Sequence, residues 1–303
     1  MKPRRVLVLV ALFIAACATA DRPNPSNAAI DRTAVQRGAY LFTAANCQGC
    51  HTDTRHHGAF LAGGVAIASS YGTFYTRNIT PDPVDGIGRW SDADFLRALR
   101  QGVSPGGTHY YPAFPFTSFT RMTDRDILDI KAYLMAQTPV PQPDRPHALH
   151  FPWSIRTLLL PWRWLYFHPG PLAPDPAHDA QWNRGAYLVQ AVAHCEECHT
   201  PRNALGGRIE SRAFSGYAMP GQAGPPAPNI TQDRESGIGR WSRQEMVSFL
   251  ATGFTPDGDA VDGRMAEVID RMAMLTSADR DAIAAYLKTI PPVSGSPRRA
   301  GKI

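Results

Sequence analysis

The sequence has little net charge, no long apolar run, few strand signals and almost no cysteine outside two short segments. Its formal charge is +5, and setting aside Lys2, Arg4 and Arg5 at the N-terminus leaves +2. This is too small for the clustered basic stripe of a nucleic-acid-binding protein, so no nucleic-acid partner is expected. The apolar run Val6–Ala16 is too short to cross a bilayer comfortably.

The N-terminus has the layout of an export signal. Basic residues precede the apolar run, and a signal over residues 1–20 would place the mature protein in the periplasm. Two ways of processing it remain open. Residues 18–20 (ATA) fit an ordinary cleavage site, whereas residues 14–17 (IAAC) resemble the lipobox of bacterial lipoproteins. Processing at the lipobox would lipidate Cys17 and anchor a lipoprotein to the membrane, and it accounts for the cysteine left over.

The sequence contains an internal repeat. Residues 37–52 (RGAYLFTAANCQGCHT) return as residues 184–200 (RGAYLVQAVAHCEECHT). Residues 78–91 (NITPDPVDGIGRWS) return as residues 229–242 (NITQDRESGIGRWS). Because the order and spacing of these segments are kept, the chain is predicted to contain one domain twice.

Helix signals close each copy. Four helices are predicted from their N-caps, which are Ser91, Thr123 with Asp126, Ser242 with Glu245, and Thr276 with Asp279. Gly102 and Gly253 end two of these helices. Since strand signals are few, the predicted fold class is all-α. Helical domains of this size would lack a sufficient core unless something else filled their middle.

A proline- and tryptophan-rich linker is predicted between the copies. Its prolines stop any long helix, and its aromatic residues lie beside Arg156 and Arg163 in an amphipathic strip. One interpretation is a stiff linker that packs its aromatic side chains across both domains. The other is a docking surface for a partner or the membrane interface, where tryptophan and arginine are favoured. The predicted boundaries are 30–138 for the first domain, 139–180 for the linker, 181–292 for the second domain and 293–303 for a tail.

Four of the five cysteines belong to two Cys-x-x-Cys-His segments. A zinc site would pair two such knuckles close together in sequence, a thioredoxin-like redox pair expects a βαβ setting, and a local disulfide leaves the histidines unexplained. Covalent haem explains the whole pattern, because two thiols add to the vinyl groups of one haem and the next imidazole binds its iron. Two covalently bound haem c groups are therefore predicted, one at Cys47, Cys50 and His51, the other at Cys195, Cys198 and His199. The haems would also supply the missing core.

With these motifs the chain resembles the dihaem cytochromes c similar to the cytochrome subunits of bacterial membrane-bound alcohol, gluconate and other dye-linked dehydrogenases. The resemblance rests on RGAYL, the cysteine motifs, NIT…GIGRWS, HTPRN at residues 199–203 and the AYL helix ends, and it covers nearly all of the chain after the signal. It implies two tandem cytochrome c-type haem domains joined by the proline- and tryptophan-rich linker, and it implies electron relay. It also implies that Gly38 and Gly185 let the first helix of each copy cross the last one closely. By the same resemblance, Met265 lies on a loop and is the second axial ligand in the second domain.

The second axial ligand in the first domain is left open. Related subunits often read YPAMP where this chain reads YPAFP, with Phe114 in place of the methionine. Met122 is the nearest thioether, and His109 is the alternative, which would lower the potential of the first haem. Met122 also aligns with Leu275 of the second copy, which favours a core role for it instead.

Two arginines follow the haem histidines closely. Arg55 and Arg202 are candidates for charge-assisted pairs with haem propionates. The alternative is that each is an ordinary solvated arginine.

Two classes of function remain. In the first, the protein is an electron carrier in which both axial positions of each iron are filled. Its predicted donor is a periplasmic dehydrogenase (a quinoprotein, flavoprotein or molybdenum enzyme), and its acceptor is quinone, another cytochrome or an oxidase. In the second, it is a dihaem redox enzyme, such as a peroxidase, with one open iron. Every motif serves haem attachment and none resembles a substrate pocket, so the carrier, which is not an enzyme by itself, is the favoured prediction.

Overall fold

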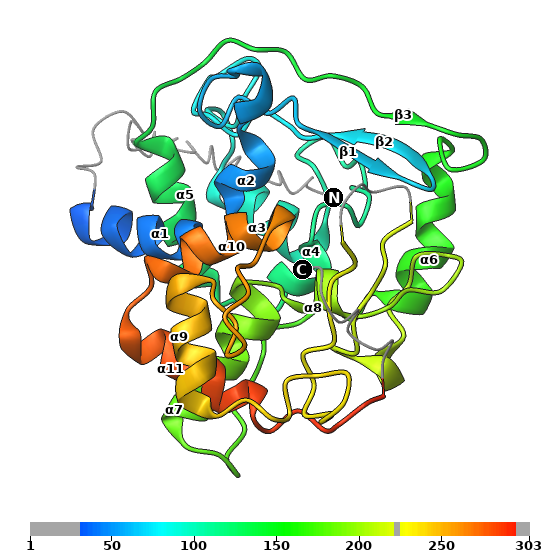
Figure 1. Cartoon of the computed structure of the whole chain (residues 1–303). Helices are drawn as coiled ribbons and strands as arrows, with labels where there is room; N and C mark the ends of the chain where they lie inside the picture. The colour runs from blue at the N-terminus through cyan, green and yellow to red at the C-terminus, as the bar shows by residue number, and fades with distance from the viewer. Residues whose placement is uncertain (1–30, 221–224, 295–303) are drawn as a thin grey trace, which may run out of the picture. The chain divides into compact units, whose positions relative to one another are not determined.

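The computed structural model describes residues 31–220 and 225–294 (Figure 1). The helices of the first copy are α1 (Arg32–Ala44), α2 (Cys47–His51), α3 (Asp92–Gln101), α4 (Phe116–Phe119) and α5 (Asp124–Met135). The helices of the second copy are α7 (Ala180–Tyr187), α8 (Glu196–His199), α9 (Arg243–Thr252), α10 (Gly263–Ala273) and α11 (Ser277–Leu287). The other helical turns are η2 (Thr54–His56), η3 (Arg156–Leu158), α6 (Leu159–Tyr166), the π-helix η4 (Leu188–Val192) and η5 (Glu210–Arg212). The repeat is visible in this order, since α1, α2, α3 and α5 match α7, α8, α9 and α11.

Several predictions concern residues for which no structure is described. The export signal at 1–20, with Cys17 of the possible lipobox, and the tail beyond Ser294 lie outside the described residues. The domain boundaries stay a prediction.

Within 31–220 and 225–294, no helix has the length and hydrophobicity that crossing a bilayer requires.

The first and last helices of each copy cross closely at a glycine. A Cβ on Gly38 of α1 would lie 1.8 Å from the carbonyl oxygen of Asp129 in α5. A Cβ on Gly185 of α7 would lie 2.0 Å from the carbonyl oxygen of Ala282 in α11. Both distances are far below van der Waals contact, so only glycine allows the two backbones to approach this closely. This is the close crossing that the RGAYL segments imply.

The predicted N-caps are confirmed. They are Ser91, Thr123, Ser242 and Thr276, at the start of α3, α5, α9 and α11. In each case the side-chain oxygen accepts a hydrogen bond from the backbone amide three residues later, which satisfies a donor that the first turn leaves unpaired. Helices α3 and α9 end, as predicted, at Gly102 (φ 59°) and Gly253 (φ 76°), both left-handed.

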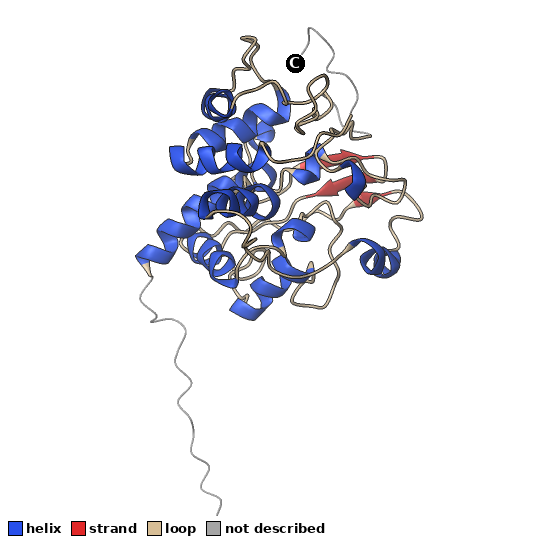
Figure 2. Cartoon of the chain, turned by 90° about the horizontal axis from the view of Figure 1, so that it is seen from below, coloured by secondary structure: helices blue, strands red, loops and turns tan. Residues whose placement is uncertain are grey.

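The prediction of an all-α fold was wrong in one respect, because the mostly helical structure also contains a small antiparallel sheet (Figure 2). Its strands are β1 (Ala66–Ser69), β2 (Gly72–Tyr75) and β3 (Ala148–Leu149), in that order. Strand β3 belongs to the linker and pairs with β2, with Thr73 opposite Ala148. Gly72, at φ 113°, makes this pairing possible, since a Cβ there would lie 2.4 Å from the carbonyl oxygen of Ala148. The strands are short and one comes from far along the chain, so no local pattern marks them.

The linker contacts both copies. On the side of the first copy, the Tyr111 hydroxyl donates to the carbonyl oxygen of Trp153 at 2.9 Å. The ring centre of the buried Phe167 lies 5.0 Å from the ring centre of Phe116. On the side of the second copy, the Asn203 amide donates to the Tyr166 hydroxyl at 3.1 Å. Part of the linker's aromatic surface therefore packs on the two copies.

Two tyrosines join the copies in a reciprocal way. The Tyr40 hydroxyl of α1 donates to Asp279 Oδ2 in α11 at 2.6 Å and accepts from the amide of the N-cap residue of that helix at 3.1 Å. The Tyr187 hydroxyl of α7 donates to Asp126 Oδ2 in α5 at 2.5 Å and accepts from the N-cap amide of that helix at 3.1 Å. Since Tyr40 and Tyr187 are equivalent in the repeat, the contact is made twice, and each copy completes the start of the last helix of the other.

Replacing Tyr40 and Tyr187 with phenylalanine is expected to destabilise the protein by about 2 kcal/mol for each tyrosine, because each loses a hydrogen bond to a carboxylate. The measurement is urea unfolding of the holoprotein, followed by circular dichroism. Tyr217→Phe is the control, since the Tyr217 hydroxyl makes no hydrogen bond within the described residues. A loss of the same size in the control would show that the effect does not come from the reciprocal contact.

Candidate functional site

Each Cys-x-x-Cys-His segment forms a short turn of helix, which brings its two cysteines, three residues apart, to the same side. The residue before each segment has a left-handed backbone, with φ of 47° at Asn46 and 42° at His194. This conformation is uncommon for residues with a side chain. Its recurrence shows that the chain turns in the same way into both segments. None of the four cysteines in the two segments is paired in a disulfide, so their sulfur atoms are available for attachment.

Both histidines are oriented by a backbone carbonyl. His51 Nδ1 lies 2.7 Å from the carbonyl oxygen of Arg77, and His199 Nδ1 lies 2.7 Å from that of Pro228. Because a carbonyl only accepts, Nδ1 carries the proton and Nε2 keeps its lone pair for a metal. Burial lowers the pKa of both imidazoles, which favours the neutral ring that a metal binds. The residues therefore fit an iron held by an imidazole at each segment.

The thiols of Cys47 and Cys195 have raised pKa values before any haem is attached. Burial raises the pKa of Cys47 to about 12 and that of Cys195 to about 12. The thiolate that disulfide exchange requires is therefore scarce. This argues against a thioredoxin-like redox pair.

The two segments lie next to each other. His194 Nε2, just before the second segment, is 3.3 Å from the carbonyl oxygen of Ala45, just before the first. Burial raises the pKa of Cys198, and Cys50 of the other copy adds to that rise. Burial also raises the pKa of Cys50, and the Arg264 cation at the start of α10 opposes the rise at both cysteines. The residues that would hold two haems therefore meet at the junction of the copies.

A buried carboxylate within the second segment ties it to the first copy. Glu197 accepts hydrogen bonds from the hydroxyls of Thr117 at 2.7 Å and Ser118 at 2.8 Å. It also forms ion pairs with Arg202 and Arg208. Burial alone would raise the pKa of Glu197, but the two guanidinium groups and the two hydroxyls lower it to about 2. This cluster was not predicted, because its members come from separate parts of the sequence.

Replacing Glu197 with glutamine is expected to destabilise the holoprotein by about 3 kcal/mol at neutral pH. Arg202 loses its counter-charge, and Arg208 keeps only its pairs with Glu196 and Glu210. The pKa of Glu197 is lowered on folding, so its contribution is present above the unfolded value of 4.5 and is lost as the pH falls towards about 2. The difference between wild type and variant should therefore shrink over this range.

Denaturant unfolding at a series of pH values measures this effect. Glu235→Gln is the control, because Glu235 is exposed and pairs with no cation among the described residues. A difference between wild type and Glu197→Gln that stays constant across the range would contradict the assignment.

The two arginines predicted near propionates lie in different surroundings. Arg202 pairs with Glu197 and donates to the carbonyl oxygen of Gly206 at 2.8 Å. Arg55 is exposed in η2. Their contacts with propionates stay predictions.

The predicted loop around Met265 was wrong, because Met265 lies in helix α10. This helix buries Ile269 and Met272 at helical spacing, and Met265 is half-buried on the same core. The apolar periodicity of residues 263–273 was the signal that could have identified the helix. The role of Met265 as an iron ligand stays a prediction.

The candidates in the first domain are also placed. Met122 is fully buried in the core, just before the N-cap of α5, and Leu275 is buried at the matching place before α11. The matching positions favour a core role for Met122, as does its alignment with Leu275 in the repeat. His109 is half-buried, and its Nδ1 is buried without a hydrogen-bond partner among the described residues. Neither residue is assigned as a ligand by these contacts, and both stay predictions.

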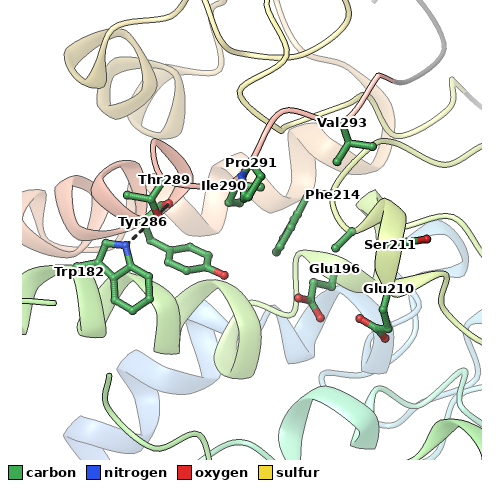
Figure 3. A pocket seen from close by; sticks show the side chains of 11 residues that line it. Trp182, Glu196, Glu210, Ser211, Phe214, Tyr286, Thr289, Ile290, Pro291 and Val293 are labelled. Carbon is green, nitrogen blue, oxygen red and sulfur yellow. Dashed lines mark hydrogen bonds between the residues drawn. The ribbon is translucent and has the colours of Figure 1, made fainter. Parts of the chain in front are cut away.

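A cavity of about 410 Å³ lies beside the second segment (Figure 3). Trp182, Phe214 and Tyr286 form its aromatic walls, and Glu196 and Glu210 face it. The Trp182 indole donates to Thr289 at 2.8 Å. The lining includes none of the predicted iron ligands.

Comparisons with known proteins match this arrangement. Residues 35–138 match the family model described as cytochrome c. The chain is 42% identical over 265 residues to a dihaem c-type cytochrome of Cereibacter sphaeroides. The match covers 85% of this chain and 86% of that protein.

Two further relatives are subunits of dehydrogenases. The chain is 42% identical over 257 residues to a nicotinate dehydrogenase subunit of Pseudomonas putida, covering 84% of this chain and 21% of that one. It is also 42% identical over 275 residues to the fructose dehydrogenase cytochrome subunit of Gluconobacter japonicus, covering 90% and 56%. The chain thus spans only part of the length of these two relatives.

The cofactor prediction is confirmed by this family match: the protein carries two covalently bound haem c groups. The duplicated cysteine segments, the oriented imidazoles and the near full-length relative agree. The chain belongs to the dihaem c-type cytochromes.

Proposed function

We propose that the protein is a periplasmic electron carrier that takes electrons from a dehydrogenase and passes them to the respiratory chain. Each haem, when bound, supplies a ferric–ferrous couple that carries one electron. The observation that carries the proposal is that the residues just before the two attachment segments are in contact at the junction of the copies, where His194 Nε2 lies 3.3 Å from the carbonyl oxygen of Ala45. Such a placement suits transfer of an electron from one haem to the other within the chain.

The proposed roles follow the repeat. Cys47 and Cys50 hold the first haem and Cys195 and Cys198 the second, with His51 and His199 as axial ligands. Met265 is the proposed second ligand of the second iron, and Met122, or His109 in its place, that of the first. Arg55 and Arg202 are proposed to contact the propionates.

The proposed donor is a periplasmic dehydrogenase, which is a quinoprotein, a flavoprotein or a molybdenum enzyme. This rests on the relatives, two of which are subunits of nicotinate and fructose dehydrogenases. The proposed acceptor is quinone, another cytochrome or an oxidase. The proposed location is the periplasm, with a lipid anchor if Cys17 is modified.

A carbon monoxide difference spectrum separates the carrier from a peroxidase-like enzyme. In a carrier both irons are closed, so the reduced wild type should respond slowly and with small amplitude. Met265→Ala should open the second iron and give a fast response, which shows that the assay detects an open position. A fast, full-amplitude response of one haem in the wild type would favour the peroxidase-like enzyme and contradict the electron-carrier proposal.

The donor can be identified by co-purification. Affinity-tagged holoprotein should retain a dehydrogenase, and adding the substrate of that dehydrogenase should reduce both haems. Recovery of a dehydrogenase that cannot reduce the haems would contradict the proposed donor.

A further inference from the structure

An apolar ridge on the linker is exposed to solvent. It consists of Phe151, Ile155, Leu158, Leu160, Trp164 and Leu165, and we call it the linker ridge. Trp164 is 82% exposed and Phe151 is 81% exposed. Single exposed apolar residues are ordinary, but several close together in one segment indicate an interaction surface.

Helix α6, which carries much of the ridge, is fixed on its other face. Leu159 is buried, and the Tyr166 ring packs on Gly207, where a Cβ would lie 2.4 Å from the ring. The Tyr166 hydroxyl accepts a hydrogen bond from Asn203 at 3.1 Å. Figure 1 shows α6 on the side of the molecule away from α1 and α9. The ridge is therefore presented by a held helix and is not a frayed end.

The linker segment that carries the ridge has positive charges only. From Arg145 to Pro174 the sequence contains arginine and histidine but no aspartate or glutamate. Arg145 and Arg156 line a cavity of about 300 Å³ together with Arg77. Arg77 is neutralised by Asp144 at 2.8 Å, whereas Arg145 and Arg156 form no ion pair within the described part of the chain. The cavity beside the ridge therefore has an excess of positive charge.

The two cations are held in place by aromatic rings. The Arg145 guanidinium lies 4.1 Å from the ring centre of Tyr75, and that of Arg156 lies 4.5 Å from the ring centre of Tyr111. The Arg156 guanidinium also donates to the carbonyl oxygen of His109 at 2.7 Å. Both charges are thus fixed beside the cavity, and neither is paired with a carboxylate among the described residues.

We propose that the linker ridge inserts into the surface of a bilayer that contains anionic phospholipid, with lipid phosphates at Arg145 and Arg156. Exposed tryptophan and leucine on a fixed helix, with an exposed phenylalanine in the segment before it and cations nearby, are the composition of an interfacial membrane contact. The unneutralised arginines supply the charge complementarity, since anionic headgroups attract nearby arginine. The contact is independent of the electron-carrier role and of any acyl chain at Cys17.

Binding to vesicles tests the proposal. The haem-loaded protein is secreted from an ordinary cleavable signal in place of residues 1–20, so that no acyl chain contributes. Vesicles of equal parts phosphatidylcholine and phosphatidylglycerol should bind the wild type in a flotation assay, more tightly than vesicles of phosphatidylcholine alone. Raised salt should weaken the binding, because it screens the headgroup charge.

Two variants with matched controls locate the contact. Trp164→Ser should weaken binding about tenfold, by loss of buried apolar area, whereas Phe254→Ser removes an exposed aromatic of the second copy and should bind as wild type. Arg145→Gln should weaken binding to the anionic vesicles about fivefold, whereas Arg125→Gln, at an exposed arginine of α5, should not. Haem absorption and thermal unfolding check that each variant is folded.

Three results would overturn the proposal. One is a wild type that floats with neither kind of vesicle. Another is unchanged binding by folded Trp164→Ser. The third would indicate a protein partner in place of a membrane. In that case Trp164→Ser slows electron uptake from the dehydrogenase in solution, and the wild type does not bind vesicles.

Discussion

A variant with alanine at Cys195 and Cys198 is expected to keep one covalent haem in place of two and to lose electron relay altogether. Without the two thiols no thioether can form at the second segment, whereas the first segment keeps both of its thiols. The second copy should also lose stability, since the haem completes its core. The measurements are the intact mass after acid–acetone extraction, and the rate at which the dehydrogenase reduces an external acceptor through the protein.

Matched variants make this result specific. Alanine at Cys47 and Cys50 should likewise leave one haem, at the second segment. Cys17→Ala should leave both haems in place, because that cysteine belongs to neither segment. Two retained haems in the Cys195/Cys198 variant, or pigment that washes out of the wild type, would contradict the assignment of the segments.

Replacing Gly38 with alanine is expected to destabilise the protein by about 3 kcal/mol or to prevent folding, since the new methyl group would overlap the backbone of α5. On an unconstrained helix the same change stabilises by up to about 1 kcal/mol. The sign of the effect therefore reports the close crossing of α1 and α5. Urea unfolding measures it where the variant folds, and the yield of holoprotein does so where it does not.

Gly185→Ala should behave in the same way at the crossing of α7 and α11. Gly106→Ala is the control, since its nearest neighbour would lie 4.0 Å from the added Cβ. A loss of stability in the control that matches those of Gly38→Ala and Gly185→Ala would argue against the crossing as the cause.

Structural features that depend on residues close together in the sequence were predicted correctly. The N-caps at Ser91 and Thr276 were found because a cap and its amide lie three residues apart. The cysteine segments were found because the chemistry of haem attachment needs consecutive residues. The glycine crossings were inferred from resemblance, and the geometry at Gly38 agrees with it.

Features that depend on distant contacts were missed. Strand β3 forms only because the linker returns to β2, at Thr73 and Ala148. The contacts of Glu197 join two copies of the repeat, and no spacing in the sequence marks them. Helix α10 is a different case, because its periodicity was present while the resemblance placed Met265 on a loop.

The reciprocal tyrosine contact has a consequence for how such a chain arose. The first copy holds both Tyr40 and Asp126, and the second holds both Tyr187 and Asp279, so each copy carries the two halves of one interface. A symmetric dimer of a single ancestral unit requires this self-complementarity. Covalent fusion of such a dimer removes the demand that both halves be identical, and the two halves do differ here, with Glu197 in one motif and Gly49 at the same place in the other.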